Sequence, residues 1–72
     1  MSRQERVFGE EVFYSVGKAA QLLSLSPPTI RSMCDRGRLE FVLVRWSGYR
    51  WIRKKSVDSI LEKFRNAKRR LP

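Results

Sequence analysis

A tight turn between two short amphipathic segments constrains the fold of this chain more than any other feature. Residues 16–23 carry apolar side chains at helical spacing, and Ser15 before them is a good N-cap. Ser26 is expected to cap a second helix, from Pro27 to Arg36, because proline suits the first helical position. Gly37 then fits a left-handed C-cap. Two helices joined by a three-residue turn form the helix-turn-helix pattern.

A β-hairpin and a third helix are predicted after this pair. Residues 40–44 and 49–53 are rich in β-branched and aromatic side chains, and Gly48 between them can adopt a positive φ. An isolated hairpin is marginally stable, so it must lean on the helices. Ser56 is expected to cap the third helix, which continues to about Ala67. The predicted fold is mainly α, with three helices and a two-stranded wing (residues 40–53).

The length of 72 residues allows one domain with a thin core. We expect residues 1–13 to form a partly flexible arm, residues 14–67 the folded domain, and residues 68–72 a basic C-terminal tail. Cys34 is the single cysteine and histidine is absent, so neither an internal disulfide nor a usual zinc site is expected. The longest apolar run, Phe41–Val44, is too short for a membrane span, which predicts a cytoplasmic protein.

The charge is strongly positive and unevenly distributed. The chain has 16 Lys and Arg against 7 Asp and Glu, a net charge of +9. Residues 1–14 hold two arginines against three glutamates, so the excess lies in residues 15–72. Such a surplus indicates a polyanionic partner, of which double-stranded DNA is the leading choice. A solubilising surface is the alternative, although solubility does not require one sign of charge.

Two elements are predicted to present the cationic side chains to one surface. A helix fits the major groove of B-DNA, and guanidinium groups can contact guanine edges or phosphates. The candidates in the second helix are Pro28, Thr29, Arg31, Ser32, Asp35 and Arg36. The wing candidates, expected mostly to contact the DNA backbone, are Arg45, Trp46, Ser47, Tyr49, Arg50 and Arg53.

Several of these residues have a second interpretation. Arg31 is spaced to form an ion pair with Asp35, its i+4 neighbour. Trp46 is either an exposed contact residue or part of the core, whereas Trp51 is expected in the core. Cys34 is expected to be a small buried apolar residue. No catalytic residues, metal ligands or cofactor site emerge, because paired carboxylates, histidines and a phosphate-binding glycine loop are all missing.

The segments Tyr14–Arg31, Arg36–Leu39 and Gly48–Trp51 together resemble the MerR-like winged helix-turn-helix superfamily, and within it the excisionases. The resemblance covers about residues 14–64. It implies a second helix in the major groove and a wing on the adjacent minor groove or backbone. It also implies a non-enzymatic protein that bends DNA at tandem sites and directs an integrase toward excision. Gly17 and Lys18 depart from the acidic residue that many relatives carry in the first helix.

Three functions remain open at this point. The first is an excisionase-like protein of a phage or integrative element, with an integrase as partner and cooperative self-association on DNA. The second is a small stand-alone transcriptional regulator. We expect no coiled coil or effector domain after Pro72, which favours either of these two over a full-length MerR-type regulator. Neither would need a small-molecule effector. The third is a protein-interaction adaptor or anti-repressor whose basic face binds an acidic protein.

Overall fold

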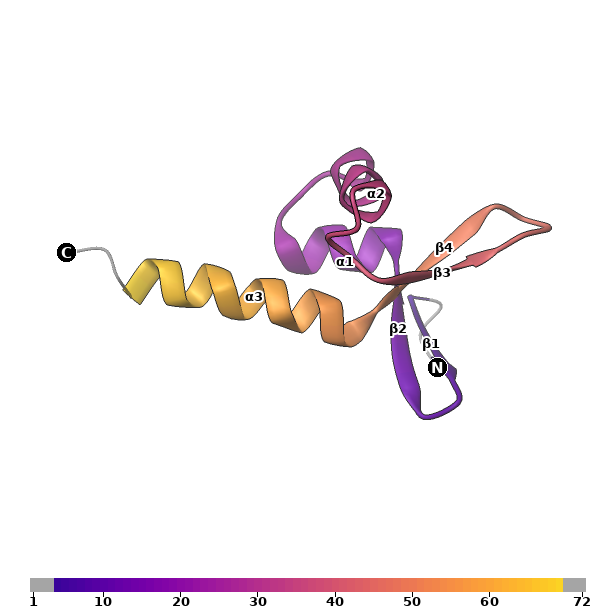
Figure 1. Ribbon diagram of the computed structural model, residues 1–72, viewed down its shortest axis with the longest axis horizontal. Helices are drawn as coiled ribbons and strands as arrows, with labels where there is room; N and C mark the ends of the chain where they lie inside the picture. Colours follow the sequence, from indigo (N-terminus) through magenta and orange to yellow (C-terminus); the bar gives the residue numbers. More distant parts are fainter. Residues whose placement is uncertain (1–3, 70–72) are drawn as a thin grey trace.

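The described part of the chain contains three helices and a four-stranded antiparallel sheet (Figure 1). The computed structural model describes the backbone of residues 4–69 and the side chains of residues 4–66. The predicted tail, residues 68–72, therefore lies outside the described side chains. The elements in chain order are β1 (Glu5–Phe8), β2 (Glu11–Ser15), α1 (Val16–Leu23), α2 (Pro27–Asp35), β3 (Phe41–Val44), β4 (Tyr49–Arg53) and α3 (Lys54–Arg69).

The helix pair forms as the sequence predicts, because both helices are capped by adjacent serines. The Ser15 hydroxyl accepts a hydrogen bond of 3.0 Å from the Lys18 N–H at the start of α1. The Ser26 hydroxyl accepts one of 3.4 Å from the Thr29 N–H at the start of α2. Gly37 follows α2 with a φ of 74°, in the left-handed region favoured by glycine. The α1 bounds are those predicted, and α2 ends one residue earlier.

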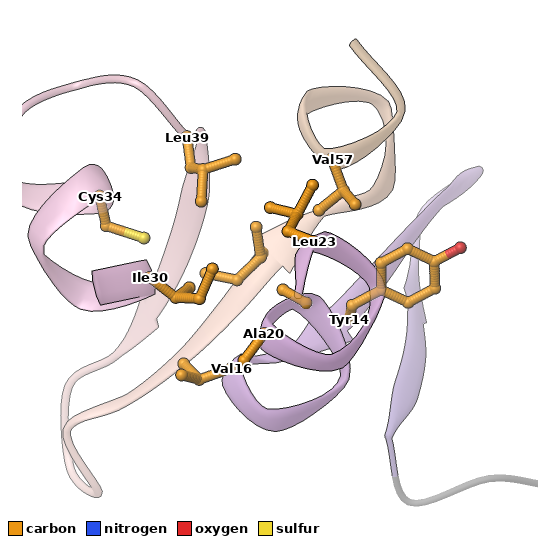
Figure 2. Close-up of a cluster of buried hydrophobic side chains, with 10 residues drawn as sticks. Tyr14, Val16, Ala20, Leu23, Ile30, Cys34, Leu39 and Val57 are labelled. Atoms are coloured by element: carbon orange, nitrogen blue, oxygen red, sulfur yellow. The ribbon is translucent and has the colours of Figure 1, made fainter. Parts of the chain in front are cut away.

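The core lies between the helix pair, the first turn of α3 and one face of the sheet. Figure 2 shows Ile30 and Cys34 of α2, Leu23 of α1 and Val57 of α3 within this cluster. Figure 2 also shows Leu39 reaching into the cluster from the segment after α2. These contacts bury the inner face of α2, so its opposite face is exposed to solvent.

The sheet has four strands where the sequence predicted two. Its order is β1-β2-β4-β3, so β4 is a central strand that pairs with β2 as well as with β3. Backbone pairing joins Tyr14 to Ile52 and Ser15 to Trp51. The added strands give the marginal β3–β4 hairpin a second partner along its inner half. Among the described residues, no strand other than β3 pairs with the outer half of β4, and this half of the hairpin projects beyond the rest of the sheet (Figure 1).

The sequence predicts a partly flexible arm for residues 1–13. Residues 5–13 differ from this prediction, because they belong to the β1–β2 hairpin. A two-residue turn joins the strands, and Gly9 in that turn has a φ of 64°. The Phe8 ring packs edge-on against Phe13 and Trp51, with centroid distances of 5.2 and 6.5 Å. Trp51 is buried, as predicted, but on this aromatic side of the sheet rather than in the main core.

Helix α3 begins at Lys54, directly after β4, so the predicted cap at Ser56 is wrong. The Ser56 hydroxyl instead accepts a hydrogen bond of 3.1 Å from the Glu40 N–H, which ties α3 to the segment before β3. Lys54 and Asp58 form an i,i+4 ion pair of 2.7 Å on the first turns. No helix within residues 4–69 is long and apolar enough to cross a membrane.

Candidate nucleic-acid interface

Helix α2 presents a polar and cationic face to solvent. Ile30 and Cys34 are buried beneath it, with exposed fractions of 0% and 4%. Five of the six residues predicted for the interface on this segment are exposed, and Ser32 is half-buried: Pro28, Thr29, Arg31, Ser32, Asp35 and Arg36. The two prolines at the first helical positions leave no N–H unsatisfied there. The structure therefore places five of them on the outward side of α2 and Arg36 at its C-cap.

Two arginines of this face are free to bind a ligand. Within residues 4–66, no acidic side chain lies within ion-pair distance of Arg31 or Arg36. The alternative in which Arg31 pairs with Asp35 does not occur. Asp35 instead binds Arg50 of the wing, with 2.9 Å between Oδ1 and the guanidinium nitrogen. Arg31 is therefore exposed and has no acidic partner among residues 4–66.

Arg50 occupies a different position from the one expected. Its guanidinium turns toward α2, where it donates a hydrogen bond of 3.0 Å to the Arg31 carbonyl besides binding Asp35. The same group lies 5.3 Å from the centroid of the Phe41 ring. Only 24% of the Arg50 side chain is exposed. It joins the wing to α2 rather than extending with the wing tip.

The tip of the wing is exposed and cationic. The turn is closed by hydrogen bonds from the Ser47 and Gly48 N–H groups to the Val44 carbonyl, at 3.2 and 2.7 Å. Gly48 has a φ of 70°, as the sequence predicted from its position. Trp46 is 90% exposed, and Arg45, Ser47 and Tyr49 are exposed as well. These four predicted wing residues remain available at the surface.

Arg53 lies apart from the other predicted wing residues. It stands at the inner end of β4, where its guanidinium binds Glu11 at 3.1 Å and Glu40 at 2.9 Å. Lys55 approaches the same Glu11 at 3.9 Å. Arg53 and Lys55 therefore form ion pairs with carboxylates of the protein itself. The structure therefore does not bring Arg53 together with the arginines of α2.

A recess lies between α2 and the wing. It has a volume of about 420 Å³ and opens between the starts of α1 and α2 and the outer end of β4. Its lining residues are Val16, Gly17, Pro27, Arg31, Gly48, Tyr49 and Arg50. Val16 and Gly17 were not predicted for the site, because only the fold brings the start of α1 beside the wing. The recess makes α2 and the wing one continuous surface.

Two further cations flank α2 on its other side. A groove of about 630 Å³ lies between α2 and α3, with Arg38 and Lys63 at its margin and Met33, Ile60 and Phe64 among its apolar lining. This groove was not predicted, since Lys63 lies more than 25 residues beyond α2 in the sequence. The cationic surface is therefore broader than predicted.

A family model described as a helix-turn-helix domain matches residues 13–65. The chain belongs to the helix-turn-helix domain family. The match supports binding of double-stranded DNA by this helix-turn-helix protein. It spans α1, α2, the wing and most of α3, and it begins within β2. Comparisons with curated proteins and with solved structures gave no match.

Proposed function

We propose that this helix-turn-helix protein is an excisionase-like architectural factor that binds tandem DNA sites, bends the duplex and directs an integrase toward excision. It would act in the cytoplasm, on the DNA of a phage or integrative element, without catalytic activity or cofactor. The observation that carries the proposal is the recess that joins the unpaired Arg31 of α2 to the exposed wing tip, with a second unpaired arginine, Arg36, at the C-cap of the same helix. The family includes excisionase-like proteins, which is consistent with this function.

In the proposed mechanism, α2 and the wing bind different parts of the DNA. Arg31 and Arg36 contact base edges and flanking phosphates in the major groove, with Thr29 and Ser32 as weaker hydrogen-bonding partners. Arg45 and Tyr49 bind the backbone beside the adjacent minor groove and supply affinity through counterion release. A single domain of this size covers few base pairs, so adjacent copies on tandem sites supply the specificity.

The decisive experiment is footprinting on the DNA that flanks the protein's own gene, with and without an adjacent integrase. We expect several protected segments side by side, increased excision in the presence of the integrase, and a binding constant that falls steeply with salt. Each phosphate contact contributes a slope of roughly −0.9 in log K against log salt. Protection near a promoter with no effect on excision would instead identify a transcriptional regulator. Salt-independent or absent DNA binding would contradict both.

A further inference from the structure

Trp46 is the most exposed large apolar residue among the described side chains. Its exposed fraction is 90%, against 7% for Trp51 in the same hairpin. No aromatic ring or cation among residues 4–66 packs against its indole. An indole is a large apolar group that is normally buried or placed at an interface. Its exposure in the free protein is consistent with a contact made in the complex.

The position of Trp46 is set by the attachment of the wing to α2. Arg50 fixes β4 to the recognition helix through the Arg31 carbonyl and the Asp35 carboxylate. Trp46 lies in the turn of residues 45–48, three positions beyond Leu43, the residue that pairs with Arg50. At about 3.3 Å per residue, the tip stands at most roughly 10 Å beyond this anchor. Adjacent major and minor grooves lie about half a helical turn apart, or roughly 17 Å. The backbone of the tip covers part of this separation, and the exposed Trp46 side chain adds to its reach.

The neighbours of Trp46 favour DNA as the surface that covers it. Arg45 precedes it and has no acidic partner among residues 4–66. Two strands joined by a tight turn form a thin projection, which Figure 1 shows extending beyond the helices. The minor groove is about 6 Å wide, so a flat ring on a narrow hairpin can enter it, whereas a helix cannot.

We propose that Trp46 is an apolar wedge that enters the minor groove beside the major groove occupied by α2. The inference rests on the proposed function and deepens it, because it assigns the bending to one side chain. The indole packs on deoxyribose and base edges and partly unstacks one base step, while Arg45 binds the flanking phosphate. Flexible pyrimidine–purine steps accept this distortion most readily, so a TA or CA step is expected under the wing.

The test compares Trp46→Ala and Trp46→Phe with wild type on circularly permuted fragments carrying one site found by footprinting. We expect Trp46→Ala to bind about tenfold more weakly and to lose most of the bend, and Trp46→Phe to retain most of both. Arg45→Ala is the matched control: its affinity falls and its salt slope flattens, but the bend persists. Trp46→Ala that bends the fragment as strongly as wild type overturns the wedge.

Iodide quenching of wild-type fluorescence provides a second measurement that needs no variant. In the free protein, iodide reaches the exposed Trp46 and not the buried Trp51. On addition of the duplex we expect the quenchable fraction to disappear and the emission to shift to shorter wavelength. Unchanged quenching in a complex that forms normally overturns the wedge and leaves the proposed function standing. A wild-type protein that binds no duplex contradicts the proposed function itself.

Discussion

Arg50 of β4 holds Asp35 of α2 in an ion pair of 2.9 Å, and this pairing leaves Arg31 free at the surface. A lone carboxylate on the outer face of α2 would repel phosphates and attract Arg31, four residues before it. Arg50 neutralises it from the wing side and also donates to the Arg31 carbonyl at 3.0 Å. The pair therefore joins the wing to α2 and leaves Arg31 without an acidic partner among the described side chains.

Replacing Arg50 tests this attachment. We expect Arg50→Ala to lower the free energy of unfolding by about 1–2 kcal/mol, since it removes a charge-assisted hydrogen bond and a half-exposed ion pair. In a double-mutant cycle with Asp35→Ala, urea denaturation should give a coupling free energy of about 0.5–1 kcal/mol. Independent, additive effects of the two substitutions would show that the ion pair does not join the wing to α2.

Arg31 is predicted to be the main determinant of sequence preference. Arg31→Ala should weaken binding to the preferred site by about 1–3 kcal/mol and reduce discrimination against altered bases, because a guanidinium reads guanine bidentately. Fluorescence anisotropy with the preferred and a scrambled duplex measures both effects. Lys55→Ala is the control, since it removes the same charge from an 81% exposed side chain near Glu11, away from α2. Equal losses for the two variants would contradict the assignment.

The parts of the fold that could be predicted from sequence are those determined locally. Ser15 and Ser26 cap their helices, and Gly37 and Gly48 adopt positive φ, because each signal acts within about four residues. The N-terminal hairpin was missed because every residue of β1 is exposed, so no apolar alternation marks it. The one usable sign was Gly9 at the first position of a two-residue turn.

The candidate site was predictable only along α2, where helical periodicity separates an inner from an outer face. The roles of the wing arginines depend on contacts between distant residues. Arg50 meets an aspartate 15 positions earlier, and Arg53 meets Glu11 from the unpredicted hairpin. In the sequence both arginines lie in the predicted wing segment and resemble Arg45. Charge composition therefore predicted a cationic surface but not which cations the protein itself neutralises.

Two glycines offer a matched test of the N-terminal hairpin. Gly9 has a φ of 64° with open space around it, so Gly9→Ala should cost about 1 kcal/mol through backbone strain alone. Gly17 lies inside α1, where an added Cβ would meet only ordinary contacts at 3.7 and 3.9 Å. Gly17→Ala should therefore stabilise the protein by about 0.5–1 kcal/mol. Thermal unfolding of both variants checks the signs, and a neutral Gly9→Ala would indicate that this hairpin contributes little stability.

Burial raises the pKa of the Cys34 thiol above its usual value of 9.0, although the neighbouring Arg50 guanidinium partly opposes the shift. The folded state therefore holds the thiol proton more tightly than the unfolded chain does. This contribution to stability is complete below pH 9 and is lost as the pH rises through the pKa of the folded state.

We expect the free energy of unfolding to decline more steeply between pH 8.5 and about 9.8 in wild type than in Cys34→Ala, because only wild type carries the thiol. Urea denaturation across this interval measures the two slopes, and the constant offset from the truncated side chain does not affect them. The interval stays below the pKa of Tyr14, which burial raises above its usual 10.0. Parallel slopes would mean that the Cys34 thiol is no harder to ionise in the folded protein, and would contradict its close packing beneath α2.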